Sequence, residues 1–96
     1  MVHFPMPDAA LRTELWESIF PEDTPISSDV DAGILAQTFE LSGASIKNAA
    51  LHGALLAQAQ GSEVGMEHIL DGIRNEYGKQ GKSFSSTQRE LLEAYE

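Results

Sequence analysis

Three histidines and several carboxylates are the side chains of this chain that could bind a metal or transfer a proton. His3, His52 and His68 are far apart in the sequence, and the chain has no cysteine. A zinc site needs closely spaced histidine or cysteine ligands, such as two histidines four positions apart on a helix. We therefore expect no metal site, and we interpret the histidines as ordinary, partly exposed side chains.

Most of the carboxylates are spread over the expected helices, and a paired catalytic dyad cannot be argued from their positions. They fall on the outer faces of those helices, where solvating charge usually lies, at Glu14, Glu17, Glu63, Glu67, Asp71 and Glu76. The sequence also lacks a GxxxxGK[ST] phosphate loop, a GxSxG elbow and a dinucleotide-binding fingerprint. The chain alone is therefore expected to catalyse no reaction and to bind no cofactor.

Composition restricts the class of protein. The chain has 96 residues, enough for one small domain, and 42% of them are apolar, which is typical of a globular protein. No run of 18 apolar residues could span a membrane, and neither a signal peptide nor cysteine is present, so we expect a cytoplasmic location. A net charge of −9 opposes direct binding of nucleic acid.

Helical spacing of apolar residues predicts an all-α fold: a small four-helix bundle with an extended N-terminal connector and a short extra C-terminal helix. The connector is residues 1–7, the helical domain 8–82 and the C-terminal extension 83–96. The expected helices run over 8–19, 31–40, 42–60, 64–78 and 86–95. Gly78 and Gly81 are expected to end the fourth helix.

The third helix is the expected centre of the fold. Ser42 can cap its start, and Leu41 can pack on Ile46 as a hydrophobic staple, a pattern that Val30/Leu35 and Val64/Ile69 repeat. One broad face carries Ile46, Ala49, Ala50, Gly53, Leu56 and Ala57, and Leu51 and Leu55 widen it. We therefore expect neighbouring helices to cover this helix over most of its circumference.

The order of short motifs in this chain resembles the C-terminal helical lid of AAA+ ATPases. Residues 3–82 carry the resemblance, through Phe4-Pro5-Met6-Pro7-Asp8, Arg12 with Leu15-Trp16, Phe20-Pro21, Val30-Asp31, Leu35-Ala36, Phe39 to Asn48, Met66 to Leu70 and Glu76-Tyr77. Each fragment is short, but their ordered combination is specific.

The resemblance implies a lid that closes over ATP and contacts neighbouring subunits of a ring oligomer. ATP and its Mg would be held by an upstream α/β ATPase domain, of which Val2 to Phe4 would be the last strand's tail. The Walker motifs would lie before Met1, so the parent protein is expected to be an ATPase. A protein substrate is possible.

The resemblance also implies site residues on two helices. Gly43 and Ala44 would approach the adenine and ribose, and Leu15 and Ile19 would wall the adenine pocket, although their spacing also suits core packing. Lys47 stands near the second-sensor position, where the family often has an arginine that reaches the phosphates. Lysine lacks the bidentate fork of arginine, and a single lysine on a helix is commonly just solvated.

A second interpretation is a free-standing helical interaction module. Its acidic surface would recognise a basic partner, or Trp16 and Phe20 would anchor a partner protein. A GxxxxGK[ST] motif roughly 150–200 residues before Val2 would favour the lid, whereas a true start at Met1 would contradict it.

Overall fold

The structure is a computed structural model that describes residues 7–21 and 23–95. These residues form five helices: α1 (Ala9–Ser18), α2 (Ala32–Thr38), α3 (Gly43–Gln60), α4 (Met66–Gln80) and α5 (Ser86–Ala94). No strand occurs among them, and the single β-like pairing is an isolated parallel bridge between Ile26 and Val64. The predicted all-α class is confirmed. The N-terminal connector lies almost entirely outside the described residues.

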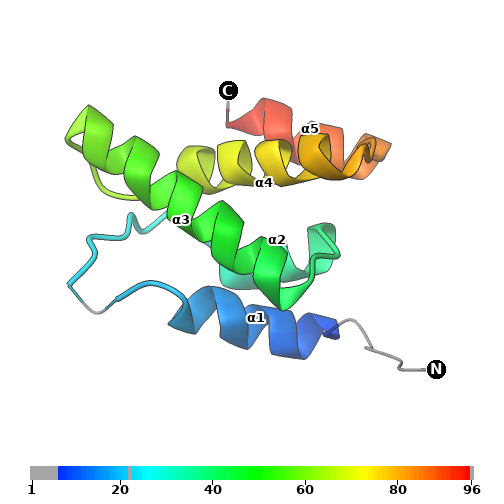
Figure 1. Cartoon of the computed structure of the whole chain (residues 1–96), viewed down its shortest axis with the longest axis horizontal. Helices are drawn as coiled ribbons and strands as arrows, with labels where there is room; N and C mark the ends of the chain where they lie inside the picture. The colour runs from blue at the N-terminus through cyan, green and yellow to red at the C-terminus, as the bar shows by residue number, and fades with distance from the viewer. Residues whose placement is uncertain (1–6, 22, 96) are drawn as a thin grey trace.

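The helices are arranged around α3, which crosses the middle of the molecule with α1 on one side and α4 on the other (Figure 1). α2 packs against α1, and α5 turns back along α4. A long loop, residues 19–31, connects α1 to α2 and passes beside the second half of α3. No helix of the described residues is long and apolar enough to cross a membrane.

Four helices begin at a residue whose side chain caps them, and the cap at Ser42 was predicted. In each case a side-chain oxygen accepts a hydrogen bond from the backbone N–H three residues on, at 2.8 Å for Asp8, 3.1 Å for Asp31, 3.1 Å for Ser42 and 3.2 Å for Ser85. At α5 the side-chain oxygen of Gln88 also accepts a hydrogen bond from the Ser85 N–H, which completes a capping box. These bonds satisfy N–H groups that the helix itself leaves unpaired.

Left-handed glycines end the two long helices. Gly61 has φ 68° and Gly81 has φ 67°, values that other residues adopt only with strain. Gly81 therefore ends α4 as predicted. The prediction for Gly78 was wrong, because Gly78 lies inside α4, three residues before the turn.

The core contains the residues that the apolar pattern placed inside. The largest fully buried side chains are those of Leu35, Phe39, Leu41, Ile46, Met66, Ile69 and Ile73. On α3, Ile46, Ala49, Ala50, Gly53 and Ala57 are buried, as predicted. Leu41 and Ile46 are both buried, as are Val64 and Ile69, which agrees with two of the three predicted staples.

The prediction that α3 is covered over most of its circumference was wrong. Leu51 is 58% exposed and Leu55 is 56% exposed. α1 and α4 pack on two sides of α3, and no helix of the described residues covers the side that carries these two leucines. The helix wheel showed an apolar arc correctly, but it could not show that part of that arc lacks a neighbour.

Three aromatic rings attach α5 to the rest of the fold. Phe84 stacks on Tyr77 at 4.5 Å between ring centroids, and Phe39 meets both rings edge to face. Gln88 donates hydrogen bonds to the carbonyl of Thr38 and to the Tyr77 hydroxyl. Together with buried Leu92, these contacts give the short helix a fixed position that its own thin apolar stripe would not provide.

Candidate functional site

Four of the five predicted site residues, Leu15, Ile19, Gly43 and Lys47, lie where α1 and α3 meet, and Ala44 follows Gly43 on the first turn of α3. We call these five residues the site strip. A Cβ atom at position 43 would lie 3.9 Å from Cδ1 of Leu15, so α3 starts against the Leu15 side chain. One turn further along both helices, Ile19 and Lys47 line the same pocket. The structure therefore brings the predicted residues of the two helices together in pairs.

The pocket under Lys47 is apolar. It has a volume of about 240 Å³ and is lined by Ile19, Phe20, Pro21, Lys47, Ala50, Leu51 and Ala54. Lysine is its one charged lining residue. The pocket thus offers apolar walls and one positively charged side chain to a ligand.

Exposure differs along the site strip. Leu15, Ile19 and Gly43 are half-buried, whereas Ala44 and Lys47 are exposed. The side chains of Leu15 and Ile19 also pack against the core. Both roles considered for them from the sequence, core packing and pocket wall, therefore remain open. Lys47 makes no ion pair with any other described residue. Its ammonium group is available to a ligand.

Arg12 is a buried residue whose role the sequence did not indicate. Its Nε donates a hydrogen bond to the carbonyl of Ala36 at 2.9 Å, and its guanidinium also donates to the carbonyl of Pro7. The arginine therefore ties α1 to α2 and to Pro7, two residues before the start of α1. Arg12 lies one turn before Trp16, on the same buried side of α1. A helical wheel of α1 would have shown this position and indicated that Arg12 is buried.

Glu76 is a correction to the prediction of outward carboxylates, because this residue is only 3% exposed. Its carboxylate pairs with Lys79 at 2.5 Å and accepts a hydrogen bond from Asn48 at 3.4 Å. A turn away, the Gln80 side chain donates to the Ser45 hydroxyl at 2.9 Å. The bonds from Asn48 to Glu76 and from Gln80 to Ser45 hold the first turns of α3 against the end of α4.

His68 is also a correction, because it is buried rather than partly exposed. Its Nδ1 accepts a hydrogen bond from the N–H of Gly65 at 2.8 Å. Nε2 therefore carries the proton and donates to Oε1 of Gln60, also at 2.8 Å. Both ring nitrogens are engaged in holding the α3–α4 connection, so this histidine has no free lone pair for catalysis or metal binding.

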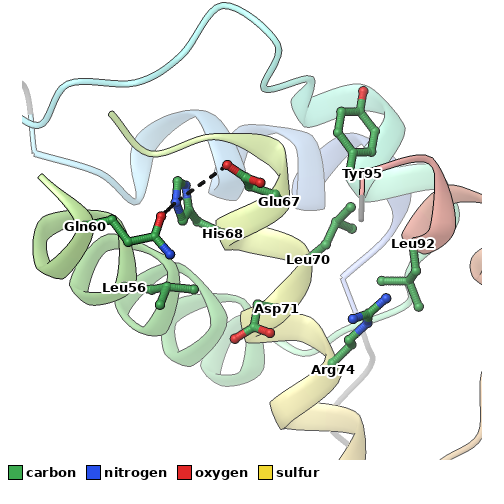
Figure 2. Close-up of a pocket in the computed structure, with 9 residues that line it drawn as sticks. All are labelled: Leu56, Gln60, Glu67, His68, Leu70, Asp71, Arg74, Leu92 and Tyr95. Atoms are coloured by element: carbon green, nitrogen blue, oxygen red, sulfur yellow. Dashed lines mark hydrogen bonds and ion pairs between the residues drawn. The ribbon is translucent and has the colours of Figure 1, made fainter. Parts of the chain in front are cut away.

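Figure 2 shows the pocket beside His68, between α3, α4 and α5. Its volume is about 230 Å³, and leucines from three helices line it together with Glu67, Asp71, Arg74 and Tyr95. Asp71 pairs with His52 of α3 at 2.7 Å. Within residues 7–21 and 23–95, no group of three or more histidine, aspartate or glutamate side chains could hold a metal ion. This pocket brings together none of the predicted site residues.

The second interpretation expected Trp16 to anchor a partner protein, but the structure buries this side chain and it cannot do so. Its side chain belongs to the core and is only 3% exposed. The indole N–H makes no hydrogen bond within the described part of the chain. Phe20 is half-buried and lines the pocket under Lys47, so it remains accessible to a ligand.

No protein-family model matches this chain, and a search of curated proteins found no match either.

Proposed function

We propose that this chain is the C-terminal lid of an AAA+ ATPase, a four-helix bundle over residues 8–82 with a helical extension over 83–96. In this proposal it closes over ATP bound to an upstream α/β domain and couples the nucleotide state to subunit contacts in a ring. The supporting observation is the site strip: residues 28 or more positions apart, singled out by the resemblance alone, are neighbours across the α1–α3 line.

The chemistry of the site strip suits the two parts of a nucleotide. Leu15 and Ile19 offer apolar surface to a base, and the absence of a side chain at Gly43 allows a base or ribose to come close to the backbone. Lys47 lies one turn further along α3 and offers a charge-assisted contact to phosphate. In the proposal Mg is held by the upstream domain, and the lid supplies no metal ligand.

The uncovered side of α3 is where the upstream domain would pack. Leu51 and Leu55 are large apolar side chains that a monomeric domain would normally cover, and Leu11 of α1 is 46% exposed as well. In this proposal the site strip and these leucines face the same partner. The chain alone would then bind nucleotide weakly and hydrolyse none.

The coding sequence before Met1 tests this proposal directly. A reading frame that continues upstream and encodes GxxxxGK[ST] roughly 150–200 residues before Val2 is the expected result. A translation start at Met1 would contradict the proposal.

A fluorescent reporter tests the site strip itself in the longer protein. This chain has no cysteine, so Ala44→Cys, in a background without other cysteines, gives one labelling position. Adding ATP or ADP should change the emission of a dye at position 44, whereas Glu93→Cys on exposed α5 provides the matched control. A nucleotide that binds without changing the dye at position 44, or that changes both dyes equally, would contradict the assignment.

A further inference from the structure

The start of α4 is held by a histidine in place of the usual capping side chains. The residue before the helix is Gly65, which has no side chain to act as a cap. Its N–H donates instead to Nδ1 of His68, the third residue of α4. In a capping box this third position carries glutamate or glutamine, whose side-chain oxygen accepts the same bond. A histidine differs because its acceptor atom can take up a proton between about pH 5 and pH 8.

Protonation of His68 is incompatible with its bond to Gly65. The neutral ring that carries its proton on Nε2 has a lone pair on Nδ1, whereas the charged ring has two N–H groups and no lone pair. In the charged ring the Nδ1–H would point at the Gly65 N–H, so two donors would face each other at the 2.8 Å that now separates the two nitrogens. The bond from Nε2–H to Gln60 is unaffected, because Nε2 donates in both states. Protonation therefore releases the start of α4 while the ring stays attached to α3.

The backbone beside Gly65 also holds the loop that precedes α2. Three hydrogen bonds join this loop to the start of α4: the Val64 N–H to the Pro25 carbonyl at 2.9 Å, the Ser27 N–H to the Val64 carbonyl at 2.9 Å, and the Met66 N–H to Oδ1 of Asp29 at 3.3 Å. The Gly65 N–H lies between the donors at positions 64 and 66. Loss of its acceptor therefore affects the junction between residues 25–29 and α4.

Carboxylates close to the ring favour its charged state. Oε1 of Glu67 lies 3.8 Å from Nε2, as Figure 2 shows. A Cβ atom at Gly65 would be 3.5 Å from Nδ1 of His68 and 3.7 Å from Oδ1 of Asp29, so Asp29 flanks the other side of the ring. The other charged or titratable groups around the pocket beside the ring are Asp71 with its partner His52, Arg74 and Tyr95. Burial opposes a charge on the ring, whereas the two nearby carboxylates offset that cost within the folded chain.

We infer that His68 is a proton-sensitive cap of α4. In its neutral state it fixes Gly65 and the junction with residues 25–29. In its charged state it releases the Gly65 N–H and loosens that junction, while its bond to Gln60 keeps the ring on α3. This inference goes beyond the proposed function and does not depend on nucleotide binding.

Nuclear magnetic resonance of the ¹⁵N-labelled 96-residue chain tests the inference between pH 8 and pH 5. At pH 8 the ring of His68 should carry its proton on Nε2. As the ring gains its second proton, the Gly65 amide signal should shift with the same midpoint. Protection of this amide against hydrogen exchange, corrected for the intrinsic effect of pH, should fall by about tenfold or more. A ring that titrates without any change at Gly65, or that gains no proton down to pH 5, would overturn the inference.

Two histidine variants assign the effect to the cap. His68→Gln restores the ordinary capping-box acceptor but cannot be protonated, so Gly65 should stay protected at both ends of the pH range. His52→Gln is the matched control, because His52 pairs with Asp71 between the same two helices and does not contact Gly65. That variant should keep the full response of Gly65. A response that persists in His68→Gln, or that disappears in His52→Gln, would overturn the inference. If His68→Gln fails to fold, the titration of the original chain decides alone.

Discussion

Gly72 of α4 and Ala49 of α3 lie so close that their helices cross almost backbone to backbone. A Cβ atom at position 72 would be 2.3 Å from the carbonyl oxygen of Ala49, well inside van der Waals contact. A Cβ atom at Gly53 would similarly be 3.0 Å from the carbonyl oxygen of His68. The small residues on α3 and α4 thus set the distance between the two helices.

Substitution of Gly72 by alanine should strongly destabilise the chain. The added methyl group meets backbone that cannot move aside without separating the helices, so the expected loss in free energy of unfolding is about 3 kcal/mol or more. Gly78→Ala is the matched control, because it lies in the same helix with open space around its Cβ position. That variant should gain about 0.5–1 kcal/mol from helix propensity.

Urea titration followed by circular dichroism measures both glycine variants. If Gly72→Ala were as stable as the original chain, the close crossing of α3 and α4 would be wrong.

Truncation of Ile46 should also be costly. Ile46 is completely buried, and it packs where the start of α3 meets the core. Ile46→Ala should therefore lower the free energy of unfolding by about 2–5 kcal/mol, which is most of the stability of so small a domain. Leu51→Ala, at an exposed position of the same helix, should change it by less than about 0.5 kcal/mol. Similar melting temperatures for the two variants would mean that α3 is rotated about its axis.

Alkaline pH should destabilise the fold through Tyr77. Burial raises the pKa of this hydroxyl above its usual value of 10.0, although the hydrogen bond from Gln88 opposes part of the rise. The folded chain therefore holds the phenolic proton more tightly than the unfolded chain does. The stability that this provides is complete below pH 10 and is lost as the pH rises through the raised pKa.

Tyr77→Phe should make the loss of stability above pH 10 less steep than in the original chain. Tyr95→Phe leaves the Tyr77 hydroxyl in place and should keep the steep loss. Urea midpoints measured from pH 8 to pH 11 test both variants, and identical pH profiles for Tyr77→Phe and the original chain would refute the burial argument.

Local rules predicted the helices well because their signals lie within a few residues. Ser42 caps α3 as predicted, and the apolar spacing identified the buried face of that helix. Features that depend on a distant neighbour were predicted poorly. Glu76 was expected to be exposed, but its buried carboxylate is paired with Lys79 and hydrogen-bonded to Asn48. Asn48 lies on another helix, so only the fold brings it to Glu76.

The candidate site likewise has parts that the sequence could indicate and parts that depend on distant neighbours. The resemblance selected Leu15 and Gly43, and only the structure revealed that they are neighbours. The exposed state of Leu51 and Leu55 could not be predicted either, because an apolar position on a helix does not say which neighbour covers it.

Substitution of Lys47 in the longer protein tests the second-sensor role. In the proposed function the ammonium group faces the nucleotide phosphates from the rim of an apolar pocket. A charge-assisted contact of this kind contributes about 1.5–3 kcal/mol, so Lys47→Ala should weaken ATP binding or slow hydrolysis by roughly ten- to a hundredfold. Lys47→Arg should keep most of the activity, because its charge is retained and its fork also binds phosphate.

Lys47→Glu should be worse than Lys47→Ala, because it places a carboxylate against the phosphates. Folding should change little in the whole series, since the Lys47 side chain is exposed and forms no ion pair with the described residues. Values of kcat and KM for the three variants, with melting temperatures as the folding control, decide the role. Kinetics within about twofold of the original protein for all three would remove Lys47 from the nucleotide site while leaving the helical fold as described.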